Sequence, residues 1–179
     1  AHGPGFSSRR QRIAISLTPP PWRGINPVPM FRPRTSRPLI LLVDDDPFQA
    51  EVASYIAEEL DCDFESALSG TEALEKVAQR APDVVLLDVR MDDLSGYEVC
   101  RRIKTFPETA DTQVLFVTAR TEEEDLLKGF EALANDYLTK PFSARELKAR
   151  TRNALRTNQL LDTLRARTQA LELQQDITE

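Results

Sequence analysis

The chain has 179 residues, of which 41% are hydrophobic, and a formal net charge of −6. This length suits one ordinary domain with extensions. The longest purely aliphatic run, Leu39–Val43, is far shorter than the roughly 20 residues of a membrane-spanning helix, so no membrane span is expected. The acidic composition and the presence of only two cysteines, Cys62 and Cys100, favour reduced packing cysteines and a cytoplasmic location.

The charge is distributed unevenly along the sequence. Residues 1–37 contain seven arginines and no acidic residue, residues 38–142 contain nine basic and 24 acidic residues, and residues 143–179 contain seven basic and five acidic residues. The first segment is interrupted by prolines and lacks periodicity, which predicts a disordered basic leader or tag, with Met30 a sensible native start. A transit peptide and a functional basic arm are the alternatives. Direct nucleic-acid binding by this chain is not expected.

Four short runs of mostly apolar residues predict strands of a parallel sheet that is buried on both faces. Polar residues stand where these runs end: Asp44 and Asp45 after 39–43, Asp88 after 84–87, Thr118 after 114–117, and Lys140 after 136–139. Ligands of such sheets bind beyond the carboxyl ends of the strands, so we expect these side chains to meet in one pocket. Three carboxylates, a hydroxyl and an ammonium together suit a divalent cation and a phosphoryl group.

Amphipathic stretches of helical length separate the runs. We expect the first helix to be capped by Asp46, to begin at Pro47, and to bury a stripe of residues at four-residue spacing, namely Phe48, Val52, Ile56 and Leu60. Later helices begin at capping boxes: Ser69 with Glu72, Ser95 with Glu98, Thr121 with Glu124, and Ser143 with Glu146. Strand and helix alternate five times, which predicts an α/β fold with helices on both faces of a parallel sheet over residues 38–142.

Four strings in this order resemble the response-regulator receiver domain of two-component signalling, over roughly residues 38–154. They are Val43-Asp-Asp-Asp-Pro47, Leu87-Asp-Val-Arg-Met91 with Gly96 following, Val117-Thr-Ala119, and Asp136-Tyr-Leu-Thr-Lys-Pro-Phe142. The resemblance implies a doubly wound, flavodoxin-like, five-stranded sheet of order 2-1-3-4-5. In that order the first and third strands are neighbours, so Asp44, Asp45 and Asp88 share one crevice.

The resemblance also implies roles for individual residues. Mg²⁺ would be held by Asp45, Asp88 and the backbone carbonyl of Arg90, with Asp44 acting through water. Asp88 would take a phosphoryl group from a histidine kinase or a phosphotransfer protein, while Lys140 pairs with Asp88 and then with the phosphoryl group.

The remaining implied roles concern the fourth and fifth strands. Thr118 would donate a hydrogen bond to the phosphoryl group, and Tyr137 would rotate toward the space that Thr118 vacates. Tyr137 could instead simply pack. The bond between Lys140 and Pro141 is expected to be cis.

The sequence departs from the family pattern at two positions, where Asp92 replaces a common proline and Ala134 a common glycine. Arg90 and Arg120 lie two residues beyond Asp88 and Thr118, at positions that tune dephosphorylation in this family. Both arginines could equally be ordinary solvated side chains.

Residues 143–177 contain no proline or glycine, so the last receiver helix is expected to continue into a long coiled-coil or linker helix. A heptad frame through it is only partly apolar, with seam positions at 154, 157, 161, 164, 168, 171 and 175. A homodimer through this helix, or through the face of the fourth and fifth helices, is expected.

Two other interpretations of the chain are open. One is a receiver-like dimerisation or scaffold module that works without phosphorylation. The other is a haloacid-type phosphatase that uses Asp and Mg²⁺, although this leaves Asp88 and Thr118 unexplained.

Overall fold

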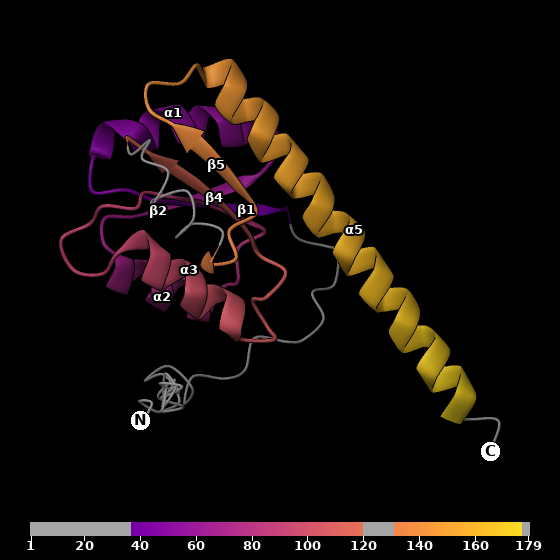
Figure 1. Cartoon of the computed structure of the whole chain (residues 1–179). Coiled ribbons are helices and arrows are strands. Elements are labelled where there is room, and N and C mark those ends of the chain that lie inside the picture. The colour runs from indigo at the N-terminus through magenta and orange to yellow at the C-terminus, as the bar shows by residue number, and fades with distance from the viewer. Residues whose placement is uncertain (1–36, 120–130, 177–179) are drawn as a thin grey trace, which may run out of the picture.

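The computed structural model describes residues 37–119 and 131–176 (Figure 1). Strands and helices alternate along the chain, and the elements described are β1 (Leu39–Val43), α1 (Pro47–Glu59), β2 (Asp63–Ala67), α2 (Gly70–Gln79), β3 (Val84–Leu87), α3 (Gly96–Thr105), β4 (Gln113–Thr118), β5 (Asp136–Thr139) and α5 (Ala144–Asp176).

The strands form one parallel sheet of order β2-β1-β3-β4-β5, which confirms the predicted doubly wound architecture. Every residue of β1, β3 and β4 is buried, whereas β2, at one edge, is mostly half-buried. The register pairs Val43 with Leu87 and Thr118 with Thr139. The carboxyl ends of neighbouring strands are therefore level, and the residues that follow them lie along one edge of the sheet.

The helices cover both faces of the sheet. In Figure 1, α2 and α3 lie together on one face, and α1 and the first part of α5 lie on the other. Side chains from α2 and α3 complete one buried cluster, and side chains from α1 and α5 complete the second. Each fully buried leucine or isoleucine of these clusters contributes about 2 kcal/mol.

The stripe expected on α1 is only partly correct. Phe48 is 65% exposed, Val52 and Leu60 are half-buried, and Ile56 packs into the core with Ala53 and Ala57. Residues four apart advance about 40° around a helix, so a row of four such residues turns by about 120° and leaves the core-facing side. Phe48 stands at the end of the row that has turned away.

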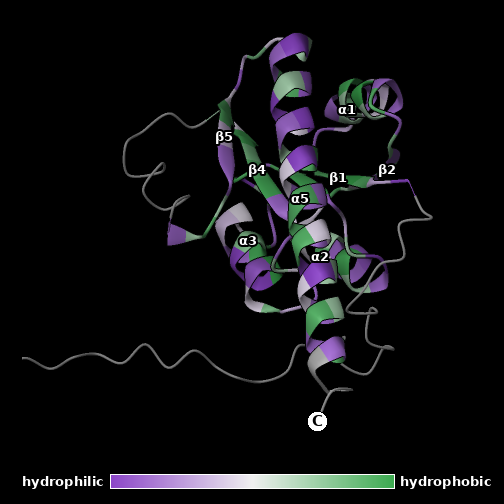
Figure 2. Ribbon diagram, turned by 90° about the vertical axis from the view of Figure 1, so that its right-hand side faces the viewer, coloured by the Kyte–Doolittle hydropathy of each residue, from purple (hydrophilic) through white to green (hydrophobic). Residues whose placement is uncertain are grey.

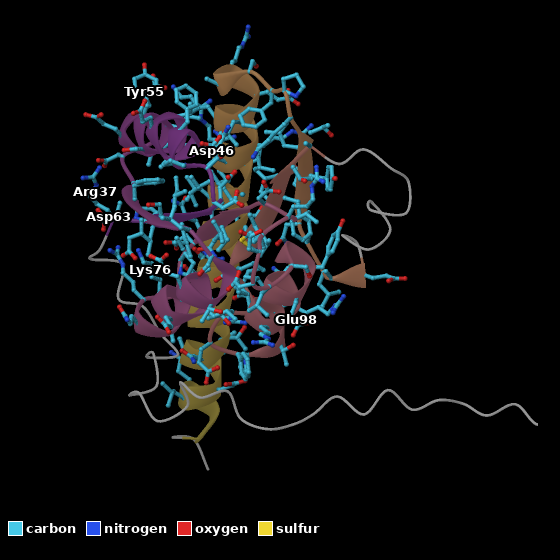
Figure 3. The ribbon with its side chains drawn as sticks, turned by 90° about the vertical axis from the view of Figure 1, so that its left-hand side faces the viewer. Arg37, Asp46, Tyr55, Asp63, Lys76 and Glu98 are labelled. Atoms are coloured by element: carbon cyan, nitrogen blue, oxygen red, sulfur yellow. The ribbon has the colours of Figure 1, made fainter. Side chains whose placement is uncertain are left out.

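The helix starts follow the capping predictions where they can be seen. Asp46, at the start of α1 in Figure 3, accepts a hydrogen bond from Phe48 N at 3.0 Å. The hydroxyls of the three described capping serines accept from the N–H of the glutamate three residues on, at 3.1, 3.3 and 3.1 Å. Glu72 accepts in return from Leu68 N, not from Ser69 N. The box that begins at Thr121 lies outside the described residues.

Helix α5 is a single helix of 33 residues, which confirms the extended C-terminal helix. Its middle is attached to the loop before β4, because Asn158 Nδ2 donates to Asp111 O at 3.0 Å and Arg165 Nε lies 2.8 Å from Asp111 Oδ2. Beyond this point the helix extends away from the sheet (Figure 1), and Figure 2 shows hydrophobic residues along that part. Among the described helices none is long and apolar enough to cross a membrane.

Both cysteines are buried free thiols, as expected for packing residues. Burial raises the pKa of the Cys62 thiol to about 11 and that of Cys100 to about 12.

Candidate functional site

The backbone brings the predicted site residues to one edge of the sheet. Asp44 N donates to Ala67 O at 3.1 Å, Asp88 N to Val43 O at 2.8 Å, and Lys140 N to Thr118 O at 2.8 Å. Each of these bonds continues the pairing between neighbouring strands by one residue past the strand end. The positions of Asp44, Asp88 and Lys140 are therefore set by the sheet.

Three of the predicted side chains are in direct contact. Lys140 Nζ lies 2.7 Å from Asp44 Oδ2 and 3.2 Å from Asp88 Oδ2. The expected pairing of Lys140 with Asp88 is present, and the shorter contact to Asp44 was not anticipated from the sequence. Asp44 Oδ1 accepts from Asp46 N at 2.9 Å, so both oxygens of the Asp44 carboxylate are hydrogen-bonded within the protein.

The electrostatics show an excess of negative charge. Asp44 is only 3% exposed, and this burial raises the pKa of its carboxyl more than the hydrogen bond from Lys140 lowers it, with the charge of Asp88 adding to the rise. Burial acts to lower the pKa of Lys140, but the hydrogen bond to Asp44 and the charges of Asp44 and Asp88 outweigh it and raise that pKa. Both shifts favour the protonated forms, as expected where two carboxylates share one ammonium group.

The carboxylate of Asp88 lies between Lys140 and the loop that follows β3. Its Oδ1 accepts from Arg90 N at 3.1 Å, its Oδ2 contacts Lys140, and its side chain is 13% exposed. The side chain of Asp45, the residue after Asp44, is exposed. Asp88 is therefore accessible to a small group at the surface and is held from two sides.

The site offers carboxylate oxygens, which are the ligands that a divalent cation such as Mg²⁺ requires. Within residues 37–119 and 131–176, no three His, Cys, Asp or Glu side chains form a cluster that could hold a metal by themselves. Mg²⁺ keeps several waters and binds through one or two carboxylates. Asp44 is almost completely buried, whereas Asp88 is partly exposed and Asp45 is exposed, so Asp45 and Asp88 are the carboxylates that a hydrated cation can reach.

Gly96 allows the loop after β3 to fold back against the backbone of Asp88 and Val89. A Cβ atom at this position would lie 2.2 Å from the backbone oxygen of Asp88 and 2.9 Å from Val89 Cα. Gly96 N also donates to Val89 O at 2.9 Å. A larger residue would displace the backbone that carries Asp88, which explains why a glycine stands in this motif.

Thr118 and Tyr137 are neighbours on one face of the sheet. Thr118 is buried, and side chains two apart on a strand share a face, so Thr118 lies on the same face as Phe116. Phe116 is paired in register with Tyr137, and their rings meet edge to face with centroids 6.3 Å apart. Tyr137 is half-buried in this arrangement.

The loops around the site bear on the predictions made for Pro141, Ala134 and the two arginines. The bond between Lys140 and Pro141 is cis, as the resemblance implied. The positive φ near Ala134 belongs to Leu133, at 66°, so Ala134 itself does not need a glycine's freedom. The side chain of Arg90 is exposed, and Arg120 lies outside the described residues.

Asp93 is a residue of this region that the sequence reasoning missed. Its carboxylate accepts hydrogen bonds from the backbone N–H groups of Gly70 and Thr71 at the start of α2. These partners are 23 and 22 residues away, and no local pattern connects them.

Comparisons with known proteins agree with this geometry. A family model described as "Response regulator receiver domain" matches residues 40–152. RpaA of Synechocystis, a DNA-binding dual master transcriptional regulator, is 38% identical over 119 residues, which are 66% of this chain and 49% of that protein. The Escherichia coli transcriptional regulatory protein CreB is 40% identical over 120 residues, 67% of this chain and 52% of that protein. The chain thus spans about half the length of the curated relatives it matches.

Solved structures show the same relationship. The BeF3-activated receiver domain of DrrB is 38% identical with a TM-score of 0.62, covering 67% of this chain and 98% of that one. A structure of DrrB from Thermotoga maritima, described as an OmpR/PhoB homologue, has the same identity and TM-score and is covered to 53%. The site residues, the sheet order and these matches agree, and the chain belongs to the response regulator receiver domain family of two-component signalling.

Proposed function

We propose that this receiver domain takes a phosphoryl group from a phosphohistidine onto Asp88, and that phosphorylation changes the conformation of another surface of the domain. The observation that carries the proposal is the contact of Lys140 with both Asp44 and Asp88 at the carboxyl edge of neighbouring strands. In a chain of this family, that contact places an ammonium beside the carboxylate that would be phosphorylated. The donor would be a histidine kinase or a phosphotransfer protein, with which the expected cytoplasmic location agrees.

The chemistry requires position and charge more than proton transfer. An Asp88 oxygen forms the new bond to phosphorus while the bond from phosphorus to the histidine nitrogen breaks, and that nitrogen keeps the electron pair and takes up a proton. A carboxylate carries no proton to remove, so no general base is needed. Lys140, already 3.2 Å from Asp88 Oδ2, would pair with a phosphoryl oxygen afterwards.

Asp45, Asp88 and the carbonyl oxygen of Arg90 would hold Mg²⁺, with Asp44 acting through water. The ion would supply neutralisation of the charge that gathers on the phosphoryl oxygens. The excess of carboxylates over ammonium groups at this edge supports the assignment.

A conformational response would begin at Thr118. The Thr118 hydroxyl would donate to the phosphoryl group, and Tyr137 would move toward the space beside β4 that Thr118 leaves. This proposal is supported by the packing on one face of the sheet. Thr118 shares that face with Phe116, and the ring of Tyr137 packs on Phe116, its partner in the strand register.

We also propose that a second copy of the chain binds along α5. Leu160, Leu164 and Leu171 are 65%, 59% and 62% exposed, and their spacing of four and seven residues puts them on one side of the helix. In a parallel pair, Arg167 of one copy would face Glu172 of the other at flanking heptad positions. The relatives named above are regulators of transcription, and no DNA contact is proposed for this chain.

Mass spectrometry of the intact chain after incubation with acetyl phosphate and Mg²⁺ tests the main proposal. We expect a gain of one phosphoryl group in the wild type and none in the Asp88→Asn variant. A folded wild type that gains nothing from any phosphodonor would contradict the proposal. That result would favour the alternative, a dimerisation or scaffold module that works without phosphate.

A further inference from the structure

The loop between β3 and α3 carries both Asp88 and the carbonyl of Arg90, and its far end is held by one side chain. Asp93 Oδ1 accepts from Gly70 N at 2.9 Å, and Asp93 Oδ2 accepts from Thr71 N at 2.8 Å and from Thr71 Oγ1 at 2.7 Å. The first N–H groups of a helix have no partner within the helix. Asp93 therefore supplies partners to the start of α2 from a distant loop.

The start of α2 is itself fixed to the sheet. Lys76, labelled on α2 in Figure 3, donates from Nζ to Ser66 O in β2 at 2.6 Å. Leu68 N, just after β2, donates to Glu72 Oε2 at 2.9 Å. Asp93 thus ties the loop to a rigid support.

Packing and charge act together at this connection. A Cβ atom on Gly70 would lie 2.7 Å from Leu94 Cβ, so the loop rests directly on the first turn of α2. Burial acts to raise the pKa of Asp93, but the hydrogen bonds from Thr71, Gly70 and Leu94 outweigh it and lower that pKa strongly. The hydrogen-bond donors around Asp93 therefore stabilise its ionised carboxylate more than its protonated form.

The residue before Asp93 adds no restraint of its own to the loop backbone. A proline at position 92, which the resemblance led us to expect, would fix the backbone φ angle there. Asp92 is exposed and has no ring to restrict the loop. The three hydrogen bonds of Asp93 to α2 provide a restraint of another kind, three residues beyond Arg90.

We infer that Asp93 is a positioning residue that holds the backbone at Arg90 in place, and that it thereby sets the affinity of the site for Mg²⁺. The inference rests on the proposed function, in which the Arg90 carbonyl is a ligand. Asp93 is not among the residues proposed to contact the cation or the phosphoryl group. Loss of its hydrogen bonds weakens Mg²⁺ binding while leaving the reacting residues unchanged.

Titration of the isotope-labelled full chain with Mg²⁺, followed by the shifts of its amide NMR signals, tests this inference. Residues that support metal ligands indirectly change affinity by about tenfold or more when replaced. We expect Asp93→Asn to raise the Mg²⁺ dissociation constant about tenfold, and Asp92→Asn, which makes the same change in charge one residue away, to change it by less than about twofold. Thr71→Val, which removes only the hydroxyl donor, should have a smaller effect in the same direction.

The outcomes separate this inference from the proposed function. If the wild type shows no Mg²⁺-dependent shifts around Asp88, the proposed metal site is wrong. If the wild type binds and Asp93→Asn binds equally well, or if Asp92→Asn weakens binding as much, the inference about Asp93 is wrong. If Asp93→Asn does not fold, an unchanged affinity in Thr71→Val overturns the inference.

A second readout separates positioning from a general loss of stability. At saturating Mg²⁺, Asp93→Asn should be phosphorylated by acetyl phosphate at the wild-type rate, and at low Mg²⁺ more slowly. A rate that stays low at saturating Mg²⁺ in the folded variant would contradict a role limited to Mg²⁺ affinity.

Discussion

Mg²⁺ should stabilise the folded domain, because the carboxylates of the site converge only in the folded chain. Asp44 and Asp88 share the single ammonium of Lys140, and Asp45 follows Asp44 at the same edge of the sheet, so the carboxylates of this region outnumber the ammonium group that a divalent ion would supplement. A ligand that binds only the native state adds about 2.7 kcal/mol at 100 times its dissociation constant. For a domain of this size that corresponds to a rise in melting temperature of roughly 8–16 °C.

Thermal melts of two neighbouring variants, with Mg²⁺ and with a chelator, provide the test. Asp45→Asn should lose most of the rise, because it removes a proposed ligand. Asp46→Asn makes the same change in charge but keeps the cap of α1, since asparagine caps a helix about as well as aspartate. It should retain the rise. Equal responses of wild type and Asp45→Asn would refute the proposed ligand set.

Three further predictions concern other parts of the molecule. Because hydrogen bonds lower the pKa of Asp93, its stabilising contribution is fully present above the ordinary aspartate pKa of about 3.9 and is lost as the pH falls below it. In urea denaturation, the free energy of unfolding of wild type should therefore exceed that of Asp93→Asn by an amount that is constant from about pH 5 to 8 and becomes smaller below about pH 4. A difference that becomes larger in acid would contradict this. In sedimentation experiments Leu164→Glu should weaken self-association, whereas Leu173→Glu, equally exposed on the opposite side of α5, should not; monomeric wild type in both phosphorylation states would refute the dimer. The phosphorylated chain should lose its phosphoryl group faster in the Arg90→Ala, Arg120→Ala double variant if these arginines obstruct water, and unchanged or slower decay would show that they do not.

Much of the sheet could be predicted from the sequence because buried parallel strands are short, continuous and apolar. The runs that form β1, β3 and β4 are of this kind, and the polar residue that follows each run marks the edge where ligands bind. The order of the strands could not be obtained in this way. A pattern along the chain does not state which strand pairs with which, and the order came from the resemblance.

The parts that were missed depend on contacts between distant residues. Lys140 and Asp44 are 96 positions apart, and their short contact arises because Asp44 is buried at the end of a central strand. The hydrogen bond from Thr71 N to Asp93 likewise joins the first turn of α2 to a loop 22 residues away, and only the folded sheet brings the two together. The error at Phe48 had a different cause, since exact four-residue spacing turns away from the core over the length of α1.

Locating the phosphorylated residue is the measurement that tests the central claim most directly. The chain would be phosphorylated by a donor with a phosphorus–nitrogen bond, such as phosphoramidate, in the presence of Mg²⁺. Treatment with borohydride would then reduce the acyl phosphate to a stable alcohol, and the modified residue would be identified by peptide mass. The account predicts the modification at Asp88 alone, with none in Asp88→Asn. Modification of another carboxylate in the wild type, or an unchanged gain of phosphate in Asp88→Asn, would contradict it.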